Sequence, residues 1–421
     1  MAVAHAAYAQ DRGAVTDFLA GALLISAVLF NAVLAIINAK VMPLNTSIVI
    51  ACEVLIVAAA HVLALTQLRT QMLPWYALIL FLMAFALFRW AALGAPEVKY
   101  LRDVLLIPTF IILGMTFSRE RLASVLVPLQ LIVLGVLLLE VLSLDTYADL
   151  FNIKSYYINT RGYTEEDFWN TTSNLFVSAS RPDDRFFTFL DYHRMSSVFL
   201  EPVSLGDYCI IIFSFALAFW RNLTAIQRIV LLGGSILLIV GCDSRLATVS
   251  CLIITAASLI APRMPPRIVV LVPGAVLIAA FAAVTYLGLK PGPDNFSGRL
   301  AHTVDLLRTY GTAEFFGISE TYMSKAVDSG LAYLISTQSV MGVLVIWLFI
   351  ALYTDERTKE AVIFKTSIAL YLSLSMLVSF AFLTIKTAAI VWFVMGALQS
   401  APARPAVRSR TGTTWRRQMA R

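Results

Sequence analysis

Charged residues are scarce in this chain, and their scarcity excludes an ordinary water-soluble domain. Only 14% of the 421 residues are charged and 59% are hydrophobic, whereas soluble domains carry about 25% charged residues. The mean hydropathy is +0.80, and apolar runs of roughly 20 residues, enough for a helix to cross the hydrocarbon core, recur along the chain. We therefore expect an all-α polytopic membrane protein, because a barrel would show short alternating segments instead.

Cysteine and histidine are also rare, with four of each. The cysteines all fall in or at the ends of apolar runs, which argues against a disulfide framework in the loops. They are Cys52, Cys209, Cys242 and Cys251. The N-terminal stretch carries Asp11 and Asp17 and lacks the basic region of a removable signal peptide, so we expect the first span to act as the insertion signal.

The apolar runs predict about twelve membrane-spanning helices. The predicted spans are residues 18–37, 46–66, 73–94, 101–118, 122–143, 195–220, 227–242, 246–261, 267–288, 329–353, 362–381 and 385–400. Only "FLTIKT" interrupts the last two, which leaves one long tilted helix or a re-entrant segment as an alternative. No internal repeat is visible, and this weakens the case for an inverted-repeat transporter.

The distribution of positive charge predicts which ends of the spans face the cytoplasm. The C-terminal tail, residues 401–421, has six arginines and no acidic residue, so the positive-inside rule places it in the cytoplasm. The net charge of +6 is explained largely by this bias and needs no nucleic-acid partner. The chain then divides into membrane segments 1–143, 195–288 and 329–400, separated by two large outer loops, 144–194 and 289–328.

Loops of this length in a compact domain are usually functional. We expect the first loop to form a partly helical cap on the membrane. In the second, "NFSGRLAHTVDLL" (295–307) predicts a helix capped by Asn295 or Ser297. Arg299 and His302 share one face of that helix by the i, i+3 rule.

Charges near membrane depth are by default candidates for function, and those of this chain gather on the predicted outer side. Arg194 lies just before the span at 195–220, and Glu201, followed by a proline, lies about two turns into it. Asp243 and Arg245 occupy a short hinge between two spans, and Asp328 precedes the span at 329–353.

Each of these residues also has a simpler structural interpretation. Arg194 could anchor a helix at the interface, and Glu201 could belong to a structural ion pair. Asp243 and Arg245 could pair at the turn while Ser244 caps the next helix. Asp328 could be a helix cap, and the face that carries Arg299 and His302 could simply be solvated.

The shared sidedness of these residues favours a common site over independent roles. Arg194, Arg245 and Arg299 would converge where the spans open into the two large loops. Arginine binds phosphate oxygens in a bidentate manner and keeps its proton, so such a cluster next to lipid suits a phosphate or pyrophosphate headgroup.

At these residues the sequence resembles the O-antigen polymerase and ligase superfamily, which assembles bacterial surface polysaccharides. The matching stretches are "RMSSVFLEPVSLG", "DSRLATVS", "DNFSGRLAHTVDLL" with "FFGIS", and "DSGLAYLISTQSVMGVL". The resemblance implies an inverting, metal-independent glycosyltransferase of the membrane-embedded GT-C type without a cofactor. It acts at the periplasmic face of the bacterial inner membrane on undecaprenyl-diphosphate-linked sugars.

By this resemblance, Arg194, Arg245 and Arg299 match positions that hold the donor pyrophosphate. Glu201 or His302 would be the base for the attacking hydroxyl, and the two remain unranked. Asp243 would orient Arg245, and Asp328 would orient the acceptor or pair with an arginine. A chain-length regulator is a partner that the family suggests.

The expected reaction moves a growing glycan from its undecaprenyl diphosphate carrier onto a lipid-linked repeat unit. The first alternative is a ligase that passes the glycan to a lipid A core or another acceptor. The second is a transporter or flippase of lipid-linked oligosaccharide, which predicts charges at the middle of the bundle. Glu53 and Arg89 are the main such charges in the early spans.

Overall fold

The computed structural model describes residues 2–94, 96–168, 173–179, 185–188, 192–292, 295–319, 328–354 and 356–400, with side chains from residue 13 onward. This part of the chain consists of helices and connections and contains no strand, which confirms the all-α prediction. The basic tail at 401–421 lies outside the described residues.

Within the described residues, seven α-helices lie before residue 200 and ten lie after it. Those before the first large loop, and within it, are α1 (Ala2–Lys40), α2 (Thr46–Leu65), α3 (Leu73–Leu93), α4 (Val98–Met115), α5 (Leu122–Leu142), α6 (Leu144–Phe151) and α7 (Ile153–Arg161). The others are α8 (Pro202–Ala218), α9 (Ala225–Arg228), α10 (Gly234–Cys242), α11 (Arg245–Ile260), α12 (Val272–Leu287), α13 (Phe296–Thr309), α14 (Thr312–Phe315), α15 (Gly330–Tyr353), α16 (Lys359–Ser375) and α17 (Ile385–Leu398).

Eight helices of the described residues are long and apolar enough to cross a membrane. They span Gly13–Lys40, Thr46–Leu65, Thr70–Leu93, Arg119–Leu142, Ala225–Cys242, Arg245–Arg263, Pro266–Leu287 and Gly330–Tyr353. The chain is therefore a helical membrane protein. Each of the twelve predicted ranges holds a helix, but α4, α8, α16 and α17 fall outside these eight, so the number of twelve spans stays a prediction.

Two predicted boundaries are wrong. The helix expected to begin at residue 195 begins at Pro202, so Glu201 precedes α8 as its N-cap residue instead of lying two turns inside it. Proline is favoured in the first turn because its missing N–H would have no partner there. The helix expected to end at residue 381 ends at Ser375, and α17 starts at Ile385, so two helices are present as predicted and the alternative of one long helix is wrong.

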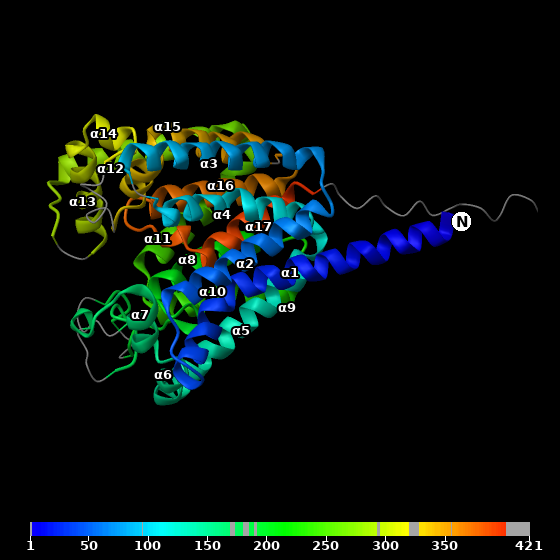
Figure 1. Ribbon diagram of the computed structural model, residues 1–421, viewed down its shortest axis with the longest axis horizontal. Helices are drawn as coiled ribbons and strands as arrows, with labels where there is room; N and C mark the ends of the chain where they lie inside the picture. The colour runs from blue at the N-terminus through cyan, green and yellow to red at the C-terminus, as the bar shows by residue number, and fades with distance from the viewer. Residues whose placement is uncertain are drawn as a thin grey trace, which may run out of the picture.

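The helices of the two large loops gather at one end of the bundle. Figure 1 shows α6, α7, α13 and α14 at its left and the N-terminus of α1 at the opposite end. Hydrogen bonds tie the first loop to α1 and α2, from Tyr156 Oη to Asn31 Oδ1 at 2.7 Å and from Thr46 Oγ1 to the Thr160 carbonyl at 3.0 Å. We call this end the capped end; residues 144–161 are largely helical, as expected for the first loop, and its role as a cap on the membrane stays a prediction.

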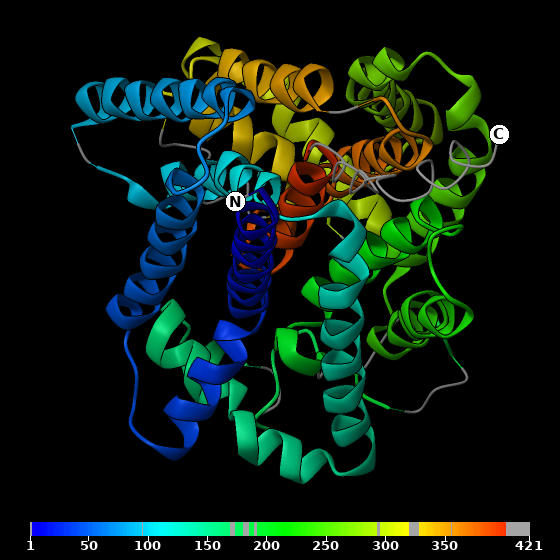
Figure 2. The same ribbon diagram turned by 90° about the vertical axis from the view of Figure 1, so that its right-hand side faces the viewer.

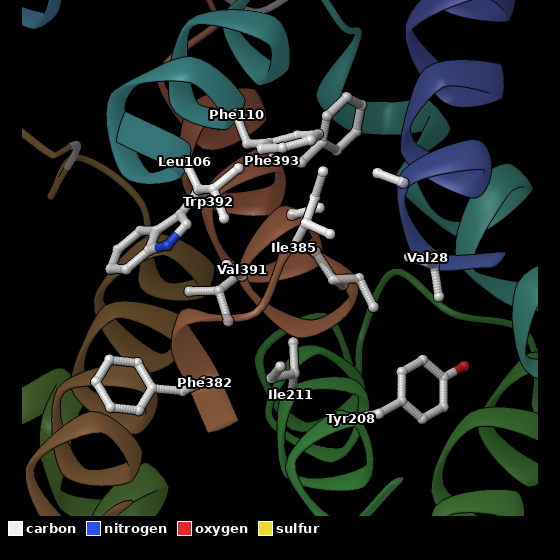
Figure 3. Packing of buried hydrophobic residues seen from close by; sticks show 14 of the residues in the cluster. Val28, Leu106, Phe110, Tyr208, Ile211, Phe382, Ile385, Val391, Trp392 and Phe393 are labelled. Carbon is white, nitrogen blue, oxygen red and sulfur yellow. The ribbon is translucent and has the colours of Figure 1, made fainter. Parts of the chain in front are cut away.

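The core is built around α17, which lies near the middle of the bundle when it is viewed along α1 (Figure 2) and whose residues are all buried. Figure 3 shows Leu106 and Phe110 of α4 packed beside Trp392 and Phe393 of α17.

Two glycines allow α4 and α17 to approach so closely. A Cβ on Gly114 would lie 2.1 Å from the Phe393 carbonyl oxygen, and one on Gly396 would lie 2.0 Å from the Ile111 carbonyl oxygen. Small residues at helix crossings are typical of membrane bundles, where association depends on close packing.

The four cysteines are all free thiols, and three of them are buried. The prediction that they are packing residues and not part of a disulfide framework is confirmed for this structure.

Candidate functional site

A cavity of about 130 Å³ opens at the capped end between the two large loops. The charged residues that line it are the arginines Arg185, Arg194, Arg245 and Arg299 and the aspartates Asp207 and Asp243. The four arginines are half-buried. The chain thus brings together, from three separate stretches of sequence, the arginines for which the sequence suggested a common site. We call this the arginine cavity.

Close packing of α8 against α11 forms one wall of the arginine cavity. A Cβ on Gly206 would lie 2.5 Å from Ser244 Oγ, so only glycine fits at this contact. Ser244 caps α11 as expected, because its Oγ accepts a hydrogen bond from Ala247 N at 3.2 Å. Arg245 is the first residue of α11 and is thereby placed beside α8.

Asp243 stands at the turn between α10 and α11 and connects it to the first loop. Its φ of 50° is in the left-handed region, which costs about 1 kcal/mol or more for a non-glycine residue. Its carboxylate oxygens accept hydrogen bonds from Phe187 N at 2.8 Å and Phe186 N at 3.1 Å. Asp243 therefore fixes the segment that carries Arg185, and the expected orientation of Arg245 by Asp243 stays a prediction.

Arg194 is held in place by main-chain contacts on both sides. Its Nε donates to the Cys242 carbonyl at 3.2 Å, and its own N–H donates to the Ala179 carbonyl at 3.1 Å. Just after it, the buried Glu140 of α5 accepts hydrogen bonds from Ser196 N and Ser197 N. Arg194 is thus part of a fixed connection between α5, α8 and α10, and it is more than an anchor at the interface.

Arg299 comes from α13, whose N-terminus matches the sequence prediction. Asn295 caps this helix by accepting a hydrogen bond from Gly298 N at 2.9 Å. Arg299 Nη1 lies 3.4 Å from Asp328 Oδ1 and donates to the Val378 carbonyl at 3.3 Å. Asp328 thus pairs with an arginine, one of its two expected roles, while Ser329 caps α15.

Glu201 does not line the arginine cavity, and its carboxylate is occupied by structural partners. It accepts hydrogen bonds from Tyr157 Oη and from Ser204 Oγ, and its Oε2 lies 3.2 Å from Lys386 Nζ of α17. Burial and the nearby carboxylate hold the pKa of the Tyr157 phenol well above its ordinary value, so Tyr157 stays protonated and its hydroxyl donates the hydrogen bond to Glu201. The structure therefore places Glu201 in an ion pair, as in its simpler interpretation.

This ion pair predicts a specific pattern of stability. Lys386→Met should lower the free energy of unfolding by about 3–5 kcal/mol, because it leaves Glu201 charged and without its cation in a mostly buried position. Adding Glu201→Gln should restore much of the loss. The measurement is reversible unfolding of the purified protein in mild detergent. Lys40→Met is a matched control, since its pair with Asp149 is exposed and should contribute about 1 kcal/mol or less.

His302 follows Arg299 by one turn of α13 and is half-buried, but it is not among the residues that line the arginine cavity. Its neighbour Thr303 is fully buried and donates to the Leu377 carbonyl at 2.7 Å. The helix face that carries these residues is therefore packed against the end of α16 and is not a solvated face.

Asp207 and Arg185 of the cavity were missed by the sequence analysis. Asp207 could have been found, because it is an acid inside the apolar run of α8, and such residues are functional candidates by default. Arg185 carries no comparable signal, since it lies among several other charged residues in a long loop.

A second cavity, of about 260 Å³, extends between α12, α15 and α16. Its walls are almost entirely apolar, as at Leu277, Leu334 and Trp347. Residues 376–379, which follow α16, separate the two cavities, because 376 and 377 line the apolar cavity and 378 and 379 line the arginine cavity. A charged site and an apolar slot therefore lie next to each other.

The early charges Glu53 and Arg89 are paired. Arg102 Nη1 lies 2.7 Å from Glu53 Oε2, and Arg89 Nη1 lies 2.7 Å from Glu97 Oε2. Arg89 Nε also donates to the Gly317 carbonyl at 2.7 Å, which ties the second loop to α3.

The arrangement of the arginine cavity suits an anion that carries more than one charge. Among the described residues that line the cavity, four guanidinium groups face two carboxylates, and one of these guanidinium groups, that of Arg299, also pairs with Asp328. Guanidinium groups in a partly dry site bind phosphate oxygens more strongly than exposed ones. Comparison of the chain with family models, with curated proteins and with solved structures gives no match.

Proposed function

We propose that this protein is an inverting membrane glycosyltransferase that polymerises a polysaccharide. It would move a growing glycan from an undecaprenyl diphosphate carrier onto a lipid-linked repeat unit, at the periplasmic face of a bacterial inner membrane. The arginine cavity is the observation that carries this proposal. It supports a site for the diphosphate of the carrier, formed by Arg194, Arg245 and Arg299, within a GT-C-type bundle of about twelve spans.

The neighbouring apolar cavity supports a lipid-linked substrate over a free phosphate. An isoprenoid chain attached to a bound diphosphate needs an apolar path that begins beside the anion site. Residues 376–379 line both cavities in succession, so head and tail of one molecule could occupy them together. A soluble anion has no apolar surface to bury, so the second cavity would add nothing to its binding free energy.

The chemistry follows from the charge of the leaving group. When the acceptor oxygen attacks the anomeric carbon, the bond to the diphosphate breaks and the leaving oxygen gains negative charge. Fixed guanidinium groups bind this developing charge more strongly than the ground state, and they lower the barrier accordingly. Packed loops over the cavity would limit hydrolysis of the donor by water.

The test is an assay of the purified protein in nanodiscs with lipid-linked repeat units isolated from the source cells. A polymerase converts them into a ladder of longer lipid-linked glycans, separated by gel electrophoresis. A ligase consumes the donor only when a second acceptor lipid is added, and a flippase moves labelled donor across vesicles without lengthening it. Translocation without elongation would contradict the proposal.

A further inference from the structure

One carboxylate of the arginine cavity, that of Asp207, has a buried oxygen without a hydrogen-bond partner. Asp207 lies one turn after Val203 on α8, and both residues line the cavity. Asp207 is 1% exposed, and its Oδ2 is buried without a hydrogen-bond partner, although the Tyr371 hydroxyl lies near the carboxylate. An unpaired buried oxygen costs about 1–3 kcal/mol or more, so its presence in a cavity wall indicates a place for a ligand group.

Three other carboxylates of the described residues near the cavity are already engaged. Both oxygens of Asp243 accept main-chain hydrogen bonds, and Asp328 is paired with Arg299. Glu201 is held by Lys386 and two hydroxyl groups outside the cavity lining. Asp207 is therefore the carboxylate of the cavity lining, within the described residues, that has an oxygen without a hydrogen-bond partner of normal geometry.

The surroundings of Asp207 fix its position. Gly206, the preceding residue, makes the close contact with Ser244 that locks α8 against the start of α11. The other titratable groups that face Asp207 belong to three elements around it and to the cavity itself. They are Tyr371 of α16, Lys386 of α17, Glu201 before α8, and the cavity arginines.

We propose that Asp207 is the catalytic base, the group that accepts the proton of the acceptor hydroxyl during transfer. This inference rests on the proposed function. The acceptor O–H proton moves to Asp207 Oδ2 while the acceptor oxygen forms its bond to the anomeric carbon. The bond from that carbon to the diphosphate oxygen breaks, and its electron pair leaves with the arginine-bound diphosphate. Asp207 then releases the proton to water.

The position of Asp207 agrees with an inverting displacement. The base must approach the anomeric carbon together with the acceptor, and the diphosphate must leave from the opposite side. Asp207 lies on the α8 wall, whereas Arg299 extends from α13 and the second loop. One cavity thus offers a proton acceptor on α8 and, on α13, one arginine of the leaving-group site, while Arg245 lies beside α8 at the start of α11.

The experiment measures elongation and binding separately. Asp207→Asn and Asp207→Ser are compared with wild type for single-turnover elongation of lipid-linked repeat units in nanodiscs. Binding of farnesyl diphosphate is measured in parallel, as a probe of the diphosphate site. We expect elongation to fall by about 10²–10⁴-fold with binding changed by less than about threefold, and Asp207→Glu to recover part of the rate. Glu201→Gln and His302→Ala serve as competing variants.

The possible outcomes distinguish a wrong assignment of the base from a wrong proposed function. If wild-type protein does not elongate the glycan, the proposed function fails. If it does, and both neutral Asp207 variants elongate at the wild-type rate, the base assignment alone is wrong. Parallel loss of farnesyl diphosphate binding would make Asp207 a structural residue of the cavity and would also overturn the assignment. A collapse of turnover confined to His302→Ala would assign the base to His302 instead.

Discussion

Arg245→Ala and Arg299→Ala are each expected to weaken the binding of farnesyl diphosphate by about 10–100-fold, and together to abolish glycan transfer. Each variant removes charge-assisted hydrogen bonds worth about 1.5–3 kcal/mol. The loss in transfer should exceed the loss in binding, because the leaving diphosphate carries more charge in the transition state. Titration calorimetry in nanodiscs measures the first effect, and the glycan ladder measures the second.

Arg308→Ala is the matched control for these arginine variants. Arg308 also belongs to α13, but it is exposed, donates to Thr285 Oγ1 at 2.8 Å and does not line the cavity. It should bind the probe within about twofold of wild type. Full ladders from Arg194→Ala, Arg245→Ala and Arg299→Ala, in protein that unfolds as wild type does, would refute the diphosphate site.

Gly396→Val is expected to prevent assembly of the bundle, which makes it the substitution with the largest effect on stability. Its side chain would collide with the Ile111 carbonyl, which lies 2.0 Å from the Cβ position. Main-chain atoms cannot yield as a flexible side chain can, so α17 must separate from α4 along its length. Overpacking of this kind costs about 1–3 kcal/mol even where a core can adjust, and Gly114→Val should be similar.

Gly135→Ala in α5 provides the comparison, because a Cβ there meets no atom within 4 Å. Alanine should be neutral or stabilising there, by up to about 1 kcal/mol, since glycine is the poorer helix former. The yield of monodisperse protein and the detergent unfolding midpoint report both effects. A well-folded Gly396→Val protein would show that the close α4–α17 crossing is not needed.

Hydropathy predicted where the helices lie, because a chain that crosses a membrane must pair its own backbone groups in a helix and expose one continuous run of apolar side chains. It failed at the two places where the chain leaves helical geometry. Pro202 sets the start of α8 within the apolar run at 195–220, and the interruption after Ser375 is made of apolar residues that hydropathy does not distinguish from a helix.

The arginines of the site could be placed together from sidedness alone, because spans that end on one face bring their ends into one plane. The carboxylate that lies beside these arginines could not be predicted, because it depends on which helices are neighbours in the bundle. Lys386 meets Glu201 from a helix 185 residues later in the chain, and the contact between Gly206 and Ser244 packs α8, which carries Asp207, against the start of α11. Both depend on packing that no short stretch of sequence encodes.

The segment after α16 holds its neighbours through carbonyl groups. Met376, Leu377 and Val378 present oxygens to Leu331 N, Thr303 Oγ1 and Arg299 Nη1. Every residue type supplies the same carbonyl, so the side chains of this segment could drift during evolution while the junction between charged and apolar cavities stays intact. Insertion or deletion of a single residue would shift all three oxygens at once. We therefore expect the length of this segment to vary less among related proteins than the identities of its residues.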